Sequence, residues 1–336
     1  MYKKYLITGA SGFLGSAVIN KLVLSSAKIY ALTLPNDRLV SKLPENVVRI
    51  NGDICNRSTL TEFFEAADDT SCVIHCAGIV SIASRLDDML YKVNIDGTKN
   101  ILSGCLDRHV AKFVYVSSVH AIPELPKGQT ITETKTFSPE SVFGWYAKSK
   151  AAATQAVFEA VKQGLNASVV FPSGIIGPND EAKGSITSML SSYLSGNLPV
   201  AVKGAYDFVD VRDIAEGILS CAEKGEKGEG YILSGHYVTI KEIIDCVKLI
   251  TGIKKRVVYF PMCVAKAVAP LYERIASRKK QKLFYTPYAV RVLCSNGRFS
   301  NAKARRMLNF NPRSIEETLS DTVKWIRNGF VENKTE

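Results

Sequence analysis

The stretch KYLITGASGFLG at residues 4–15 decides the fold of this chain of 336 residues. It opens with an apolar run that predicts a buried strand, and the residues after it carry apolar side chains at helical spacing. Between the two, glycine recurs at every third position as Gly9, Gly12 and Gly15. A turn without side chains lets the backbone approach a pyrophosphate, and the N-terminus of the next helix offers free N–H groups to its charge. The stretch therefore predicts a dinucleotide-binding strand–turn–helix unit.

The rest of the first 172 residues continues this alternation. Apolar, β-branched runs that predict strands alternate with helical patterns, as parallel βαβ units require. The predicted strands are 28–34, 47–54, 71–78, 112–118 and 166–172, and the predicted helices include 59–67, 91–106 and 147–162. We therefore expect an α/β fold with a doubly wound parallel sheet of the Rossmann type.

Beyond residue 172 the pattern loosens, and glycine and proline become frequent. This change predicts a dinucleotide-binding domain at 1–172 and a smaller, irregular α/β C-terminal lobe for the substrate at 173–330. We expect residues 204–235 to return to the first domain. The chain length fits two such units, at roughly 100–200 residues each.

The composition excludes several classes of protein. With 46% hydrophobic and 22% charged residues, the chain is typical of a globular protein. No apolar run of about 18 residues predicts a transmembrane helix, and the N-terminus lacks the layout of a secretion signal. The eight cysteines stand apart, and none are paired at the spacing of a zinc site. We expect a cytoplasmic protein with reduced cysteines and no bound metal.

The positive charge is concentrated near the C-terminus. Of the 43 Lys and Arg residues, 20 follow residue 240, against 8 of the 32 Asp and Glu residues. An apolar helical pattern at 262–275, which we expect to bend near Pro270, adjoins a basic cluster made of Arg274, Arg278, Lys279, Lys280 and Lys282. This segment could cover a substrate cleft, rest on an anionic membrane, or be a core helix with a solvated loop. We expect no nucleic acid as a partner, because no nucleic-acid-binding module accompanies the charge.

A tyrosine and a lysine with the spacing YxxxK begin the predicted helix near residue 147. Tyr146 and Lys150 are four residues apart, which places both side chains on one face of the helix. A nearby ammonium group, together with the positive nicotinamide of an oxidised cofactor, favours the phenolate and brings the pKa of the tyrosine towards the range of general acid/base catalysis. Ser118, at the end of the preceding strand, can hydrogen-bond the same substrate oxygen. We predict Ser118, Tyr146 and Lys150 as the catalytic residues.

Further motifs follow in a fixed order along nearly the whole chain. They are GDI (52–54), HCAG (75–78), VNIDGT (93–98), YVSS (115–118), YAKSK (146–150), FPSGIIGP (171–178) and DFVDVRDIA (207–215). With the glycine turn, they resemble the extended branch of the short-chain dehydrogenase/reductase superfamily, the NAD-dependent epimerases and dehydratases. The resemblance implies hydride transfer between a nicotinamide and a substrate carbon. Tyr146 would give or take the hydroxyl proton, Lys150 would hold the cofactor ribose, and Ser118 would position the substrate oxygen.

The resemblance also implies a set of cofactor contacts. Asp53 and Ile54 would hold the adenine, Ala77 and Gly78 would let the cofactor pass over the fourth strand, and Asn94 would brace the active-site strand, if it is not merely a satisfied helix residue. The full set of cofactor-binding residues that we expect is Gly9, Gly12, Phe13, Leu14, Gly15, Arg38, Asp53, Ile54, Ala77, Gly78, Asn94, Tyr146, Lys150, Pro172 and Ile175.

The choice between NAD(H) and NADP(H) depends on the end of the second strand. An acidic residue there accepts from the ribose 2′-OH and repels a 2′-phosphate. Thr33 and Leu34 occupy the deciding positions and carry no charge. Arg38 could reach a phosphate, although Asp37 beside it weakens that field. We expect either cofactor, with a slight preference for NADP(H).

Departures from the sugar-nucleotide enzymes point to a different substrate class. Val119 and His120 follow Ser118 in place of the Asp-Glu pair of the dehydratases, and Tyr206 stands where epimerases often carry Arg. FPSGIIGP and the run at 299–323 resemble dihydroflavonol reductases and 3β-hydroxysteroid dehydrogenases instead. The resemblance implies an oxidoreductase for an apolar, cyclic or aromatic alcohol or ketone. The expected substrate contacts are Val80, Ser81, His120, Trp145 and Ile175.

Two other functions stay open at this point. One is a nucleotide-sugar 4-epimerase, and the other is a cofactor-sensing protein without turnover. By resemblance we expect a homodimer built on helices such as 91–106 and 147–162. A peripheral membrane contact would use the basic C-terminal region.

Overall fold

The computed structural model describes residues 2–278 and 285–332. Its centre is a seven-stranded parallel sheet in the order β10-β6-β5-β4-β1-β2-β3, which confirms the predicted Rossmann-type fold. The strands are β1 (Lys4–Thr8), β2 (Lys28–Thr33), β3 (Val48–Asn51), β4 (Ser71–His75), β5 (Lys112–Val116), β6 (Ala167–Pro172) and β10 (Gly230–Leu233).

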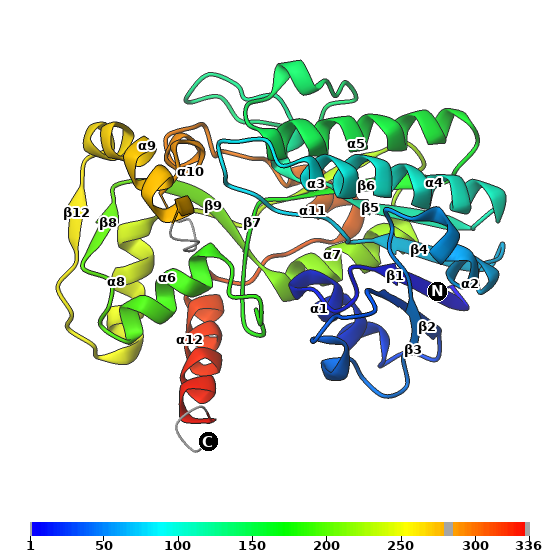
Figure 1. Cartoon of the computed structure of the whole chain (residues 1–336), viewed down its shortest axis with the longest axis horizontal. Coiled ribbons are helices and arrows are strands. Elements are labelled where there is room, and N and C mark those ends of the chain that lie inside the picture. The colour runs from blue at the N-terminus through cyan, green and yellow to red at the C-terminus, as the bar shows by residue number, and fades with distance from the viewer. Residues whose placement is uncertain (1, 279–284, 333–336) are drawn as a thin grey trace.

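Helices cover both faces of this sheet (Figure 1). On one face lie α1 (Phe13–Leu22), α7 (Val211–Lys224) and α11 (Ala302–Leu308). On the other lie α2 (Thr61–Glu65), α4 (Thr98–Asp107) and α5 (Trp145–Lys162). A short helix, α3 (Asp88–Tyr91), and a wider turn at Lys92–Gly97 lead into α4, so the helix predicted at 91–106 is not uniform.

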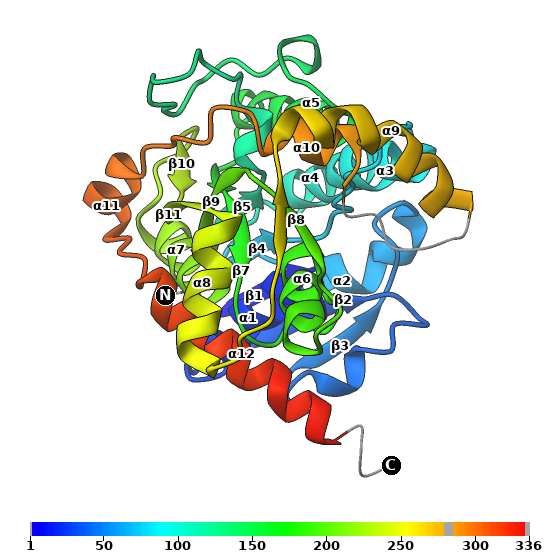
Figure 2. The ribbon, with the colours of Figure 1, turned by 90° about the vertical axis from the view of Figure 1, so that its left-hand side faces the viewer.

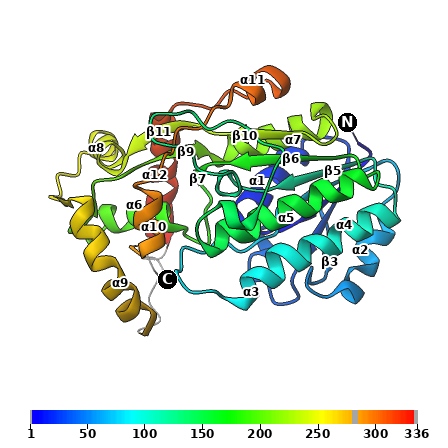
Figure 3. The same ribbon diagram turned by 90° about the horizontal axis from the view of Figure 1, so that it is seen from above.

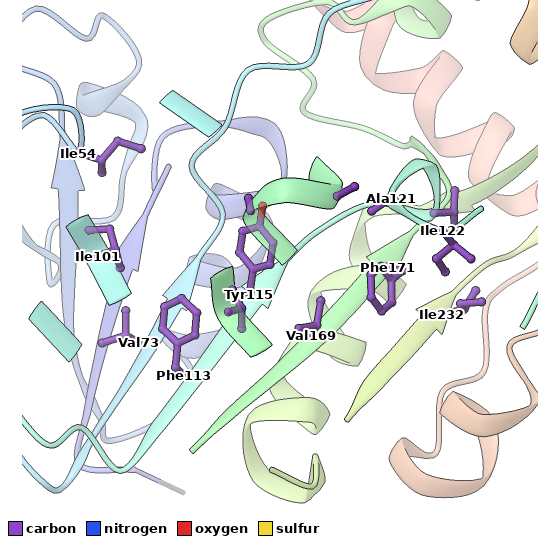
Figure 4. Packing of buried hydrophobic residues seen from close by; sticks show 14 of the residues in the cluster. Ile54, Val73, Ile101, Phe113, Tyr115, Ala121, Ile122, Val169, Phe171 and Ile232 are labelled. Atoms are coloured by element: carbon purple, nitrogen blue, oxygen red, sulfur yellow. The ribbon is translucent and has the colours of Figure 1, made fainter. Parts of the chain in front are cut away.

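Near-continuous apolar strands explain why both faces are covered, since every residue of β4 and β5 is buried. On the α4 and α5 side, Val73, Phe113 and Val169 pack beside one another beneath the helices (Figure 4). Tyr115 lies in the same layer and carries a hydroxyl into it. Its position at the end of β5 brings a polar atom close to the start of α5.

The strand order reverses between β1 and β4, and ligands of open α/β sheets bind in the crevice at such a point. Thr8 and His75 are paired across these strands, so their carboxyl ends meet at one edge. Gly9 has a φ of +66°, and a Cβ there would lie 2.6 Å from the backbone nitrogen of Ala77. Glycine is therefore required for the β1 turn to pass the end of β4.

A smaller lobe lies beside the central sheet (Figures 1 and 2). It holds a three-stranded sheet of β7 (Gly174–Ile176), β9 (Ala205–Asp210) and β11 (His236–Thr239), and a pair of β8 (Val200–Val202) and β12 (Val258–Phe260). Its helices are α6 (Ser185–Leu194), α8 (Ile240–Thr251), α9 (Met262–Arg278) and α10 (Pro287–Val292), and α12 (Ile315–Glu332) packs against α8 and α6. Residues 230–233 do not belong to this lobe, because they form strand β10 of the central sheet.

The helix α9 continues through Pro270 to Arg278 without a break. Pro270 lies on the exposed side of the helix, where solvent can satisfy the carbonyl group that lacks a donor. Figure 3 shows α9 at the outer edge of the molecule. No helix in the described ranges is both long and apolar enough to cross a membrane. Lys279, Lys280 and Lys282 of the basic cluster lie outside the described residues.

Candidate active site

The glycine turn between β1 and α1 forms a cradle without side chains. The Gly12 amide donates to the Gly9 carbonyl at 3.1 Å, and a Cβ at Gly15 would overlap that same carbonyl. No side chain caps α1 at Gly12, which leaves the amides of the first helical turn to a ligand. Leu14 anchors the helix in the core, whereas Phe13 is half-buried. The cradle fits the pyrophosphate of a dinucleotide.

The expected adenine side of the site follows β2 and β3. Ile54 is buried against Gly97, and the Asp53 carboxylate accepts from the amide of Cys55 at 2.9 Å. The loop after β2 folds back so that the Ser11 hydroxyl donates to Asp37, whose carboxylate also accepts from the Leu39 amide. Asp37 therefore lies against the glycine turn. Its neighbour Arg38 is exposed.

Asn94 ties the segment after β4 to α5. Its Oδ1 accepts from the Ile79 amide at 2.7 Å, and its Nδ2 donates to the Ile79 carbonyl at 3.0 Å and to Ser149 Oγ at 2.9 Å. The side chain is 1% exposed, so each of these bonds is shielded from water. Next to it, a Cβ at Gly78 would lie 3.3 Å from Lys150 Nζ.

The predicted catalytic residues come together at the carboxyl edge of β5. Tyr146 and Lys150 occupy the first turns of α5, and Ser118 follows β5; all three are buried. Lys150 Nζ donates to the Val116 carbonyl at 2.9 Å and to Tyr115 Oη at 3.4 Å. Burial lowers the pKa of Lys150 to about 8. The ammonium group is thus held in place between the end of β5 and the site of the expected cofactor.

The pKa of Tyr146 differs from the expectation. Burial raises this pKa to about 12, and a hydrogen bond with Ser118 opposes part of the rise. Lys150 does not produce the expected lowering in the protein alone, since its ammonium group is turned to Val116 and Tyr115. In this state Tyr146 is a proton donor, which suits a general acid.

The model of the NAD dependent epimerase/dehydratase family matches residues 5–234. The chain belongs to this family. It is 28% identical to sterol demethylase protein B of Methylococcus capsulatus (96% of this chain, 98% of the relative). It is 25% identical to a dihydroflavonol 4-reductase-like protein of Synechocystis (98% and 96%). The UDP-glucose 4-epimerase of Thermotoga maritima has the same fold, with a TM-score of 0.79 at 22% identity (97% and 99%).

These findings confirm the predicted membership of the extended short-chain dehydrogenase/reductases. They also confirm the resemblance to dihydroflavonol reductases and sterol-converting relatives. The protein is an enzyme of this NAD-dependent family, and the predicted oxidoreductase activity agrees with its relatives.

Three tyrosine rings surround His120 in this epimerase/dehydratase-family site. Tyr206 stacks on the imidazole at 5.7 Å between centroids, and its hydroxyl lies 3.0 Å from His120 Nε2. Tyr146 meets it edge-on at 6.0 Å, and Tyr288 lies at 6.1 Å. Burial lowers the pKa of His120 to about 4, so the imidazole is neutral at pH 7. His120 therefore lies between Tyr146 and two tyrosines of the smaller lobe, Tyr206 and Tyr288.

The other expected substrate residues are spread over the rim. Val80 is 73% exposed, and Ser81 accepts from the Ala83 amide at 3.2 Å. The Trp145 indole donates to the Ser84 carbonyl at 3.1 Å, and Ile175 is half-buried in β7. Pro172, expected at the cofactor, is buried at the end of β6.

Sequence reasoning missed four residues of this site: Tyr115, Gly144, Ser149 and Tyr288. Tyr115 and Ser149 stand inside YVSS and YAKSK, so the motifs themselves carry the signal that could have found them. No local signal marks Tyr288, which reaches the site from α10. Across the described ranges, no group of three or more His, Cys, Asp or Glu residues could hold a metal ion.

Proposed function

We propose that this protein is a nicotinamide-dependent oxidoreductase for an apolar, cyclic or aromatic alcohol or ketone. The observation that carries the proposal is the position of Ser118 and Tyr146 beside an aromatic wall of His120, Tyr206 and Tyr288. Such a wall offers apolar contact area with a few polar atoms, as pockets for small apolar molecules do. The sterol demethylase and dihydroflavonol reductase relatives carry names that fit this substrate class.

The residues of the chain divide the work by position. Ser118 and Tyr146 would bind the substrate oxygen, and Tyr146 would give it a proton in reduction or take one in oxidation. Lys150, held by Val116 and Tyr115, would contact the ribose of the cofactor. The glycine turn would hold the pyrophosphate. When bound, the cofactor supplies or accepts the hydride.

The site supports a 4-epimerase of nucleotide sugars less well. Such an enzyme must hold a diphosphate, and Tyr206 replaces the arginine often found there. The hydroxyl of Tyr206 is already bonded to His120 and carries no positive charge. The likeness to the solved epimerase is a likeness of fold.

For the cofactor we propose NAD(H). Asp37, bound to Ser11 in the glycine turn, puts a carboxylate where a 2′-phosphate would have to lie. The slight expectation of NADP(H) rested on Arg38. This residue is exposed and makes no bond with the glycine turn among the described residues. The carboxylate would accept from a ribose 2′-OH and repel a phosphate.

The test offers purified protein NADH or NADPH together with steroid, flavonoid and simple cyclic ketones, and in a separate arm NAD⁺ with UDP-glucose. We expect NADH oxidation by a lipophilic ketone. Tyr146→Phe should lower the rate by roughly 10²–10⁴-fold, the usual contribution of general acid–base catalysis, while binding of NADH, followed by fluorescence, persists. Tyr237→Phe, on an exposed tyrosine, is the matched control. Epimerisation of UDP-glucose without ketone reduction would overturn the proposal, and so would cofactor binding without any turnover.

We also propose contact with an anionic membrane through α9. Val264, Val268, Leu271 and Ile275 are exposed along one face of the helix, and by helical spacing Arg274 and Arg278 border this stripe. An apolar stripe with basic edges lies in a membrane interface as amphipathic helices do. Leu271→Ser should reduce co-sedimentation with vesicles that contain phosphatidylserine, whereas Leu249→Ser, on an exposed leucine of α8, should not. Equal binding by both variants would contradict this contact.

The homodimer is a proposal of the same kind. The helices expected to form it, α4 and α5, lie side by side on one face of the sheet (Figures 1 and 3). Light scattering on the purified protein should give twice the 36.8 kDa of one chain. A mass of one chain at micromolar concentration would reject it.

A further inference from the structure

A second tyrosine packs against the same histidine as Tyr146. Tyr288, near the start of α10, is 5% exposed, and its ring centroid lies 6.1 Å from that of His120. Tyr146 packs against the same imidazole at 6.0 Å. The substrate lobe therefore delivers a polar side chain to the surroundings of the catalytic residue, and the reaction as described above does not use it.

The hydroxyl of Tyr288 makes no hydrogen bond with any residue in the described ranges. A buried hydroxyl without a partner destabilises the fold, and few such groups occur in folded proteins. Burial raises the pKa of Tyr288, and Tyr146 adds to this rise, so the hydroxyl stays protonated and can donate. A ligand atom in this space would satisfy the unused donor.

The groups around Tyr288 show what kind of atom this is. The Tyr206 hydroxyl and His120 Nε2 are bonded to each other, so Nε2 is not free to accept. Phe143 stacks on the Tyr288 ring at 6.3 Å and offers no polar atom. His120 is neutral at pH 7, because burial lowers its pKa to about 4. The Arg291 guanidinium lies on the Phe143 ring, 3.7 Å from its centroid, and Phe143 separates it from Tyr288. The groups in direct contact with Tyr288 therefore favour an uncharged acceptor over a carboxylate.

We propose that Tyr288 forms a polar subsite for a second, uncharged oxygen of the substrate. This oxygen belongs to a hydroxyl or carbonyl group on another carbon than the one that exchanges the hydride. The inference rests on the proposed function and narrows its substrate class to cyclic ketones or alcohols with two oxygen substituents. Ser118 and Tyr146 hold the reacting oxygen, and Tyr288 donates to the other.

The test compares Tyr288→Phe with Tyr259→Phe. Tyr259, on β12, also has a buried hydroxyl without a partner among the described residues, but it lies at the far edge of the lobe (Figure 1). The probes are cyclohexanone and 2- and 4-hydroxycyclohexanone. Their binding is measured by calorimetry in the presence of ADP-ribose, which lacks the nicotinamide so that neither oxidation nor reduction can follow, and their kcat/KM is measured with NADH.

We expect Tyr288→Phe to weaken binding and kcat/KM for at least one hydroxyketone by roughly 2- to 12-fold, the net value of one hydrogen bond, and to leave cyclohexanone unchanged. Its Tm should stay equal or rise, because an unsatisfied group is removed. Tyr259→Phe should share the Tm result and change neither binding nor turnover.

An equal loss for all three ketones, or no loss for any, would overturn the subsite. A wild-type protein that binds the hydroxyketones no better than cyclohexanone would do the same. Absence of turnover alone counts against the proposed function, since the calorimetry still decides the subsite.

Discussion

The ring of Tyr288 occupies the space that a Cβ at Gly144 would fill. Gly144 is the residue before α5 and has a φ of +92°, a conformation that favours glycine. Gly144 thus allows α5, the helix of Tyr146, to start at this point. It also leaves room for the smaller lobe to pack against the first turn of that helix. The contact joins the two parts of the site.

Gly144→Ala should therefore lower the free energy of unfolding by more than backbone strain alone would. We expect about 1–3 kcal/mol from the positive φ, a further loss from displacement of the Tyr288 ring, and a lower kcat/KM. Gly128→Ala is the matched control, because Gly128 has the same φ of +92° and a Cβ added there would meet nothing within 4 Å. Urea unfolding and ketone reduction measure both variants. Equal stability and activity of the two would show that the Tyr288 contact has no consequence.

Asn94→Ala should destabilise the protein and weaken cofactor binding. The change removes the bonds to the amide and the carbonyl of the half-buried Ile79, at roughly 0.5–1.5 kcal/mol for each bond. The segment that contains Gly78 then loses its tie to α5. Asn166→Ala, which removes a bond to the Ala111 carbonyl before β5, at the end of this strand opposite the site, serves as the comparison. If NADH fluorescence titration gave the same Kd for both variants, Asn94 would have no part in shaping the cofactor site.

Asp37→Asn should shift the cofactor preference towards NADPH. The amide keeps an oxygen for the Leu39 amide but removes the negative charge from the 2′-phosphate position. We expect the ratio of kcat/KM for NADPH to that for NADH to rise about tenfold, equivalent to about 1.4 kcal/mol. Arg38→Ala should leave the ratio unchanged. A fall in NADPH use by the arginine variant would instead support a role for Arg38 in holding the phosphate.

His75 should make stability fall in mild acid. It is fully buried between Thr8 and Thr98, and burial lowers its pKa in the folded protein to about 3, against 6.5 in the unfolded chain. Between these pH values the unfolded chain binds the extra proton, so stability is complete above pH 6.5 and declines as the pH falls towards 3, by about 1.4 kcal/mol per unit.

His120, with a lowered pKa of about 4, adds to the same slope. Urea unfolding between pH 7 and 5 should show a shallower slope for His75→Gln than for the wild type, and a still shallower one for the double variant with His120→Gln. An unchanged slope in His75→Gln would mean that His75 is not held neutral in the fold.

Much of this site could be predicted because its signals are local. The glycine turn and the spacing of Tyr146 and Lys150 encode geometry within one turn or one helix. The lowering of the Tyr146 pKa by Lys150 and an oxidised nicotinamide stays a prediction, whereas in the protein alone this pKa depends on burial and on where the ammonium group points. Neither quantity is visible in a spacing.

Contacts between distant segments could not be predicted. Tyr288 reaches Gly144 from the other end of the chain, and only the packing of α10 decides this. The helix α9 continues through Pro270 for a related reason, since the cost of proline depends on whether the carbonyl it leaves unpaired faces solvent. The placement of Asp37 depended on how a loop folds back to Ser11.

The edge strand β10 has a consequence for biosynthesis. The central sheet is completed by Gly230–Leu233 beside β6, and α7, which covers one face of the sheet, directly precedes this strand. A nascent chain that ends near residue 172 therefore has an open edge at β6 and a bare apolar face. Such a chain is prone to pair with other strands. The central sheet of the nucleotide-binding part can be completed only after well over half of the protein has left the ribosome. The strand order therefore rules out that the two parts of the protein fold as separate units during synthesis.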